Sequence, residues 1–173
     1  MGREIRMVPP NWEHPRYTTD NAPDNSLRSV VGEYIPMMDQ SYEDAAAEWI
    51  TGFEQWQKGE HEDQHKDWCS DIKHYWEYDS PPDSDSYRPA FTEDATWCQG
   101  YETVSEGTPF TPAFETKAEL VDWLVANGDP VHGAITKEQA ESFVDQKWAP
   151  SMIMTIDKSG ASIKGGIESL QSE

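Results

Sequence analysis

The chain has 173 residues, of which 36% are hydrophobic, and its mean hydropathy is −0.83. It carries 33 acidic and 13 basic residues, so its formal net charge at pH 7 is −20. A surface of this sign repels phosphates, which disfavours direct binding to duplex DNA and favours a partner with a positive surface. Eight tryptophans, seven tyrosines and five phenylalanines argue against a disordered chain.

The length fits one domain over 1–173. Cys69 and Cys98 are too few for a disulfide framework, and we find no cleavable signal and no membrane span in the sequence. These features predict a cytoplasmic protein with reduced cysteines that does not bind a membrane.

The first elements are a strand and a long loop. Residues 3–8 read as a short strand that Pro9 and Pro10 end, because proline lacks an amide donor. Residues 11–33 are rich in turn formers and predict a loop over the surface, which Trp12 anchors to the core.

Ser41 and Asp44 have the spacing of a helix N-terminus, and Lys58-Gly59 ends the longest predicted helix. Its apolar residues recur at three- and four-residue steps, which predicts a core-packing helix with an acidic outer face: Tyr42, Ala45, Ala46, Trp49, Phe53 and Trp56. The segment 60–78 is interpreted as a second helix with four side chains directed inward: Trp68, Ile72, Tyr75 and Trp76. Residues 79–90 are loop-rich.

The stretch from Thr96 to Gly128 has the strongest local pattern. Residues 97–104 alternate as a half-buried strand, and the prolines of TPFTP confine the next segment to a turn at a surface or a sheet edge. A capping box at Thr116 and Glu119 begins a helix that Asn127-Gly128 ends, with an apolar face of Leu120, Val121, Leu124 and Val125.

A second capping box, Thr136 with Gln139, begins a helix that buries Ala140, Phe143 and Val144. SMIMTID and ASIK then read as a hairpin around the turn Lys158-Ser159-Gly160, and the tail 165–173 is expected to fray. The inventory predicts an α+β fold, a small and mostly antiparallel sheet packed with about three or four helices.

Several stretches resemble a family of small acidic proteins carried by tailed bacteriophages and prophages. They are the opening REIRMVPPNWEHPR, the central YETVSEGTPFTPAF and ELVDWLVANGD, and the later WAPSM. The resemblance implies a phage origin and one intact domain, and hence the cytoplasm of an infected bacterial host. It supplies no catalytic residues.

The sharpest motif is His61-Glu62-Asp63-Gln64-His65, which matches H-E-x-x-H. On a helix this spacing places two imidazoles on one face for zinc, with the glutamate as general base. The flanking residues are polar or charged and give the segment no apolar face to exclude water. A third ligand would have to come from Glu77, Glu93 or His74. A zinc-binding protein or metalloenzyme is therefore an alternative interpretation.

Other enzyme motifs are missing from the sequence, which contains no P-loop, no dinucleotide fingerprint and no G-x-S-x-G. Cys69 and His74 are close along the chain, as in a nucleophilic pair, but we interpret Cys69 as a buried structural residue. We predict a protein that is not an enzyme and has no cofactor.

The acidic excess is concentrated in residues 39–102, with 17 acidic against 4 basic residues. Carboxylates spaced along helices can occupy a groove that normally binds nucleic-acid phosphates. The candidate partner-binding residues are Glu43, Asp44, Glu48, Glu60, Glu62, Asp63, Asp67, Asp71, Glu77 and Asp79, and Asp83 and Asp85 extend them. The alternative without a specific function is a solvated acidic face that has no partner.

Together these features predict a non-enzymatic phage protein that inhibits a host defence complex, of the anti-CRISPR or anti-restriction type, by mimicking nucleic acid. Its partner would be a host protein with a basic nucleic-acid-binding surface. A second alternative is a sponge that sequesters a host signalling nucleotide. That function would require arginines to converge on the phosphates, namely Arg3, Arg6, Arg16, Arg28 or Arg88.

Overall fold

The computed structural model describes residues 2–23, 29–103, 106–130, 133–157 and 160–170. Contacts divide the chain into two compact units. Unit 1 comprises Met1–Pro36 and Phe91–Glu173, and unit 2 is the intervening segment Met37–Ala90. The expectation of one domain over 1–173 stays a prediction.

Unit 1 is built on a four-stranded antiparallel sheet of order β5-β4-β1-β6. Its strands are β1 (Gly2–Val8), β4 (Trp97–Thr103), β5 (Thr108–Phe114) and β6 (Trp148–Pro150). The strands predicted over 3–8 and 97–104 are thus confirmed, apart from Val104, which lies outside the described residues. The central pair joins strands about a hundred residues apart, so the two segments of unit 1, which precede and follow unit 2 in the sequence, form one sheet.

The segment TPFTP forms strand β5 rather than a turn. Pro109 and Pro112 have no amide hydrogen, and β5 accommodates them because it is the edge strand and pairs on one side only. The predicted edge position is confirmed. The register of β4 and β5 shifts between Gln99 and Tyr101, opposite this proline-containing stretch.

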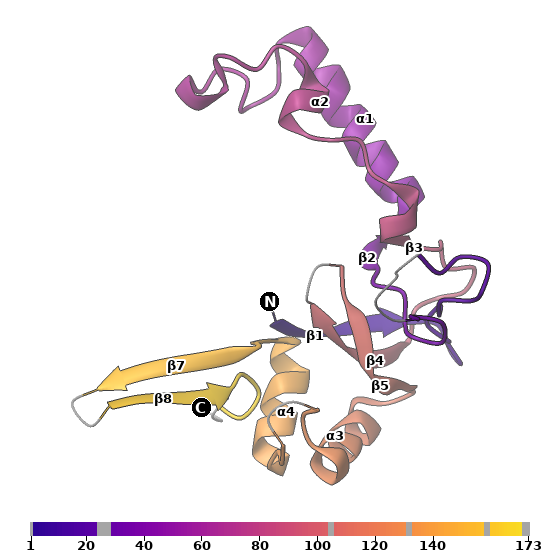
Figure 1. The fold of residues 1–173 in the computed structure, drawn as a ribbon, viewed down its shortest axis with the longest axis vertical. Coiled ribbons are helices and arrows are strands. Elements are labelled where there is room, and N and C mark those ends of the chain that lie inside the picture. Colours follow the sequence, from indigo (N-terminus) through magenta and orange to yellow (C-terminus); the bar gives the residue numbers. More distant parts are fainter. Residues whose placement is uncertain (1, 24–28, 104–105, 131–132, 158–159, 171–173) are drawn as a thin grey trace. The chain divides into compact units, whose positions relative to one another are not determined.

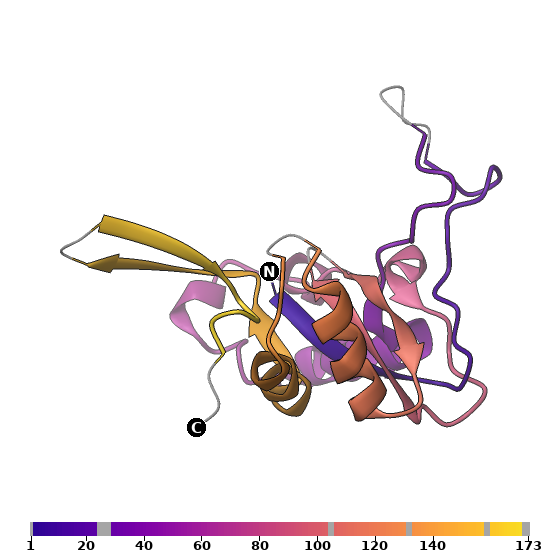
Figure 2. The same cartoon turned by 90° about the horizontal axis from the view of Figure 1, so that it is seen from below.

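Two helices, α3 (Lys117–Asn127) and α4 (Lys137–Gln146), cover one face of the sheet (Figures 1 and 2). Both begin with the predicted capping boxes, and Gly128 ends α3 with a φ of 75°. Their buried faces pack with the sheet into the main core: Cys98, Leu120, Val121, Leu124, Ile135, Ala140, Phe143, Val144, Ala149 and Ile167. The prediction that Val125 lies on the buried face of α3 is wrong, since its side chain is 41% exposed. The buried face consists of Leu120, Val121 and Leu124.

A hairpin follows the sheet, formed by β7 (Met152–Asp157) and β8 (Gly160–Gly165). The predicted hairpin is confirmed, and residues 158–159 of its turn lie outside the described residues. The tail expected to fray over 165–173 is instead buried at residues 165–167, with Ile167 in the core. Residues 171–173 lie outside the described residues. An apolar side chain close to the chain end is held there by the area it buries.

Unit 2 is organised by helix α1 (Tyr42–Lys58), which begins at the predicted N-cap Ser41 and ends at Gly59. Strands β2 (Met38–Ser41) and β3 (Tyr87–Arg88) form a short parallel pair. The remaining elements are one-turn helices, namely α2 (Tyr75–Tyr78) and two 3₁₀ turns at Asp67–Cys69 and Ser84–Ser86.

The second helix predicted over 60–78 is wrong, because the segment forms turns that lead to the 3₁₀ turn and to α2. Residues 60–67 contain no aliphatic or aromatic apolar side chain, so a helix there would have no face to bury. Ile72 and Tyr75 pack inward as predicted, whereas Trp68 and Trp76 are 62% and 49% exposed.

The core of unit 2 is small and aromatic. Trp56, Cys69 and Tyr75 are buried, and four partly buried side chains pack against them: Trp49, Phe53, Ile72 and Tyr78. The aromatic stripe predicted on α1 is confirmed from Trp49 to Trp56, whereas Tyr42 at its start is 39% exposed. The overall α+β class, with a mostly antiparallel sheet and four α-helices among the described residues, is confirmed. No helix in the described ranges has the length and apolar character needed to span a bilayer.

Candidate functional site

The predicted acidic residues all lie in unit 2, whose 54 residues include 14 acidic and 4 basic ones. Nine of the ten candidate carboxylates are exposed, and Asp63 is partly buried. Unit 2 has the same net charge as unit 1, −10, on fewer than half as many residues. Its surface is therefore the more densely charged of the two.

Four of these ten carboxylates hold local structure together. Asp44 accepts a hydrogen bond from the Ser41 hydroxyl at the start of α1, at 2.8 Å. The Glu77 carboxylate accepts from the backbone N–H groups of Lys73 and His74, which lowers its pKa. Asp79 accepts from the Tyr75 hydroxyl at 3.2 Å. Changing any of these residues would alter the fold as well as the charge.

Asp63 is the fourth structural carboxylate. It binds the Lys66 ammonium and accepts a hydrogen bond from the Tyr78 hydroxyl at 2.6 Å. These hydrogen bonds lower the pKa of Asp63, and the bond to the carboxylate raises the pKa of Tyr78 to about 12. Tyr78 therefore remains a donor at neutral pH and ties the 60–66 turns to α2.

The other six candidates make no side-chain hydrogen bond or ion pair with any residue that the structure describes. They are Glu43, Glu48, Glu60, Glu62, Asp67 and Asp71. Because these carboxylates are exposed and make no such contact, they can form ion pairs with cations of a partner without breaking an interaction that stabilises the fold.

A polar pocket of about 220 Å³ lies beside α1 in the acidic unit. Glu48 and Asp79 contribute carboxylates to its lining, and Trp49 and Tyr75 contribute aromatic rings. The indole N–H of Trp49 donates to the Asp79 carbonyl at 2.9 Å, which fixes the ring against this wall. No basic residue is among those that line the pocket. Carboxylates next to aromatic rings suit a lysine or arginine side chain.

The H-E-x-x-H motif is not helical, so its two histidines do not share a helix face. His61 packs among the rings of Trp56, Tyr75 and Tyr78, with centroids 5.1–5.6 Å away. The His65 Nε2 instead lies 2.9 Å from the Gly59 carbonyl. Within the described ranges no three His, Cys, Asp or Glu side chains come close enough to share a metal ion. The helical arrangement that the zinc alternative required is therefore not formed at His61 and His65.

Neither cysteine sits in a nucleophilic arrangement. Cys69 is buried in the core of unit 2, as predicted. Its sequence neighbour His74 stacks on Trp76 at a centroid distance of 4.4 Å. Burial raises the pKa of Cys98, which favours the thiol over the reactive thiolate.

The arginines that a nucleotide sponge would need are engaged separately. Arg3 and Arg6 are three residues apart on β1 and so lie on opposite faces of the sheet. Arg3 pairs with Glu102 and Asp129, whereas Arg6 pairs with Glu4. The other candidates do not join them: Arg16 lies over the Tyr34 ring, Arg88 pairs with Asp39 in unit 2, and Arg28 lies outside the described residues.

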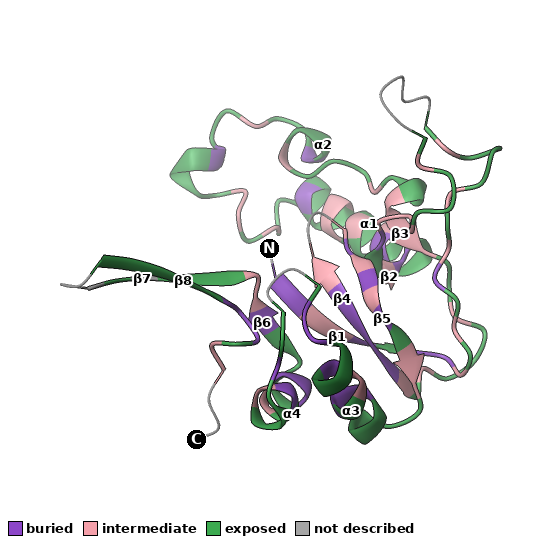
Figure 3. Ribbon diagram, turned by 60° about the horizontal axis from the view of Figure 1, so that its bottom comes forward, coloured by how far each residue is buried: buried purple, intermediate pink, exposed green. Residues whose placement is uncertain are grey.

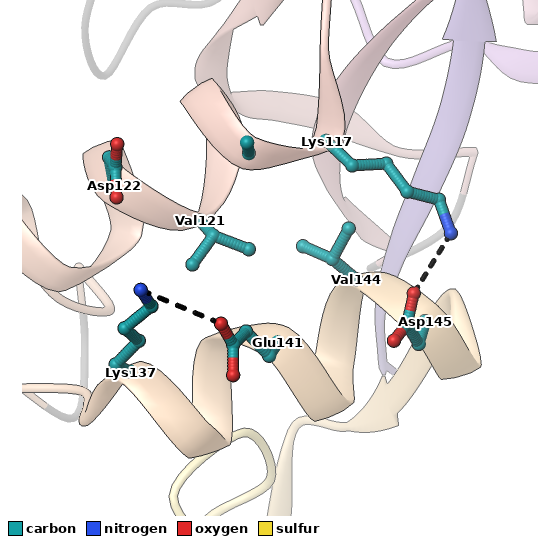
Figure 4. A pocket seen from close by; sticks show the side chains of 8 residues that line it. Lys117, Val121, Asp122, Lys137, Glu141, Val144 and Asp145 are labelled. Carbon is teal, nitrogen blue, oxygen red and sulfur yellow. Dashed lines mark hydrogen bonds and ion pairs between the residues drawn. The ribbon is translucent and has the colours of Figure 1, made fainter.

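A second pocket, of about 310 Å³, opens between α3 and α4 in unit 1 (Figure 4). Val121 and Val144 contribute apolar walls. Its two lysines are each paired, Lys117 with Asp145 at 3.0 Å and Lys137 with Glu141 at 3.8 Å. Asp122 adds a third carboxylate to the lining, so the pocket has a net negative formal charge and is unsuited to a phosphate group.

A buried polar network on the other face of the sheet was missed by sequence reasoning. His14 is buried there, and its Nε2 donates to the Ile35 carbonyl at 2.7 Å. Because a carbonyl only accepts, Nε2 carries the proton of the neutral imidazole. His14 Nδ1 and Gln99 Oε1, each 3.0 Å from the Tyr101 hydroxyl, are then both acceptors for the one proton of that hydroxyl. Arg6 lies over the Tyr101 ring at 4.3 Å. The sequence did hold one indication of this network. Arg3 and Arg6 place a charged side chain on each face of the strand REIRMV, so a buried face of that strand needs polar partners.

His14 should make stability depend on pH. Burial lowers the pKa of His14 below its ordinary 6.5, the hydrogen bond to Ile35 opposes this shift, and the charges of Arg6 and Arg16 add to it. The unfolded chain then takes up a proton more readily than the folded protein. The stabilisation is present above pH 6.5 and is lost as the pH falls below that value.

Urea denaturation of the wild type and of His14→Gln tests this. The advantage of the wild type in free energy of unfolding should shrink between about pH 7.5 and pH 5, because the wild type, unlike the variant, must keep a buried imidazole neutral at position 14. His65→Gln, at an exposed histidine, controls for the loss of an imidazole. A difference between wild type and His14→Gln that stays constant with pH would contradict the assignment.

Comparisons with models of protein families, with curated proteins and with solved structures return no match. The resemblance to a phage family therefore stays a prediction, and the functional argument rests on the acidic surface of unit 2 and its pocket.

Proposed function

We propose that this protein is a non-enzymatic binding protein that engages a basic, nucleic-acid-binding surface of another protein through unit 2. The six unengaged carboxylates would supply long-range attraction to that surface. Exposed, flexible carboxylates alone give little specificity, so a second feature has to fix the position of the partner.

The observation that carries the proposal is the pocket beside α1. Its carboxylates, Glu48 and Asp79, stand next to the rings of Trp49 and Tyr75 in the most densely acidic part of the chain. An arginine or lysine of the partner would insert there, with its charge against the carboxylates and its stem against the rings. A groove that binds nucleic acid is lined with such side chains.

The target follows from the resemblance rather than from the geometry. If the chain is a phage protein, a host defence complex with a basic groove, of the CRISPR or restriction type, is the partner that this surface would block. It would act in the cytoplasm of the infected cell and would not bind duplex DNA itself.

The proposal is tested by reversing charges that the fold does not use. The triple variant Glu48→Lys, Glu62→Lys, Asp71→Lys changes three exposed, unengaged carboxylates of unit 2. Its matched control, Glu13→Lys, Glu115→Lys, Asp122→Lys, makes the same change in charge at exposed residues of unit 1. Both should keep the melting temperature within a few degrees, since surface substitutions change stability little.

Binding is measured by the fluorescence anisotropy of a labelled nona-arginine peptide and by capture from bacterial lysate at low and high salt. We expect the unit 2 variant to bind the peptide at least about tenfold more weakly and the control to bind nearly as the wild type does. Captured proteins should be released as salt rises. Equal losses in the two variants would mean that net charge alone acts, and the assignment to unit 2 would fail.

A further inference from the structure

The β7–β8 hairpin exposes a continuous apolar face. Met152, Met154 and Ile156 alternate along β7, and directly opposite on β8 lie Gly165, Ile163 and Ala161. Residues paired across an antiparallel ladder lie on the same face, so these side chains form one uncharged surface. Met154, Ile156 and Ile163 are 59%, 73% and 62% exposed. The reverse face has polar residues, among them Ser162 and Lys164.

This hairpin pairs with no other strand of the described chain and extends from the end of the sheet in unit 1 (Figures 1 and 3). An isolated two-stranded hairpin is at best marginally stable in water, and it usually gains stability from a third strand or from a covered apolar face. The exposed face is therefore expected to be covered.

The base of the hairpin is fixed to the body of unit 1. The Gly166 N–H donates to the Ser151 carbonyl at 3.2 Å, and Ile167 next to it is buried in the core. Both strands thus leave the sheet from an anchored position, which presents the apolar face in a preformed state.

Charge indicates what covers this face. The hairpin, residues 152–165, contains two lysines and one aspartate, whereas the whole chain has a net charge of −20. Two copies of the chain repel each other over most of their surfaces, and they can approach with least repulsion at the hairpins. The basic partner proposed above would be drawn to unit 2 rather than to this cationic, acid-poor segment.

We infer that the β7–β8 hairpin is the self-association surface of this protein, on which a second copy packs the same apolar face about a two-fold axis. Such an interface is isologous, and a two-fold axis near the central pair Met154 and Ile163 would bring the same apolar face of both copies together. The inference does not depend on the proposed function.

The small size of the ribbon makes this dimer a weak one. Six-residue strands are about 20 Å long, and two strands are about 10 Å wide. The face therefore spans roughly 200 Å², well below the area of about 800 Å² per partner that is usual in stable complexes. We expect a dissociation constant of about 10 to 500 µM.

Sedimentation equilibrium of the full chain, from about 10 to 500 µM at about 0.1 and 0.5 M salt, tests the inference. We expect a reversible monomer–dimer equilibrium that strengthens with salt, because salt screens the repulsion between two acidic copies. Binding of the nona-arginine peptide weakens with salt, so the two proposals fail separately. A wild type that stays monomeric at the highest concentration and salt overturns the inference.

Two neighbouring residues provide the matched variants. Met154→Lys places a charge on the apolar face, and Ile153→Lys places the same charge on the reverse face, opposite Lys164. Met154→Lys should weaken dimerisation at least about tenfold and Ile153→Lys much less, since only the first buries a charge in the interface. Circular dichroism verifies that both fold. Dimerisation that survives Met154→Lys, or that is lost equally in both variants, excludes this face.

Discussion

Replacing Arg3 by methionine is expected to lower the free energy of unfolding by about 3–5 kcal/mol, the usual effect of removing one partner of a buried ion pair. The side chains of Arg3 and Asp129 are 2% and 4% exposed, and Nε of the arginine lies 3.0 Å from Oδ2 of the aspartate. The substitution leaves a carboxylate in the interior without its guanidinium partner. Urea denaturation followed by circular dichroism measures the change.

An exposed ion pair provides the control. Lys117→Met removes the pair with Asp145, whose side chains are 55% and 75% exposed, and should cost less than about 1 kcal/mol. The double variant Arg3→Met, Asp129→Leu should be more stable than Arg3→Met alone, because it removes the buried carboxylate as well as the guanidinium and leaves only the partly exposed Glu102 without Arg3. If the double variant were less stable than the single one, buried charge would not explain the effect of Arg3→Met.

Gly166→Ala should destabilise the protein by about 3 kcal/mol, the upper part of the range for overpacking a closed site. A Cβ at Gly166 would overlap the Pro150 carbonyl oxygen, a backbone atom that no change of rotamer can move. The chain would have to separate from β6, which would draw the neighbouring Ile167 out of the core. Thermal and urea denaturation test this result.

Ala90→Ser is the companion control, since it adds one heavy atom at an exposed position outside the helices and strands. Its effect should stay within about 0.5 kcal/mol. If Gly166→Ala proved equally mild, the close approach between Gly166 and Pro150 would not be required by the fold.

The features that sequence reasoning predicted well depend on contacts a few residues apart. The capping boxes at Thr116 and Thr136 each join a side chain to an amide three residues away. A short stretch of sequence is therefore enough to predict them. The same holds for the N-cap Ser41 and for the hairpin after residue 151. Prolines in TPFTP excluded a central strand for the same local reason, although they could not exclude an edge strand.

The burial of large side chains could not be predicted from short stretches of sequence. Trp68 and Trp76 were predicted inside because they are apolar, yet the core of unit 2 is already filled by Trp56 and Tyr75 with their neighbours. Whether a side chain finds apolar area to cover depends on the surfaces that other elements supply. The same limit applies to the buried network around His14, whose partner Tyr101 is 87 residues away.

The features of the candidate site likewise fall into those set by local sequence and those set by tertiary packing. The sequence by itself determined the charge of the chain, the concentration of acidic residues in 39–102 and most local helix and turn boundaries, because these follow from composition and short-range hydrogen bonding. Only the tertiary structure decided that six carboxylates are unengaged, that Glu48 and Asp79 meet two aromatic rings, and that H-E-x-x-H lacks a helix. Those outcomes require segments distant in the chain to be packed together, and packing is set by the summed burial of the whole unit rather than by any short stretch.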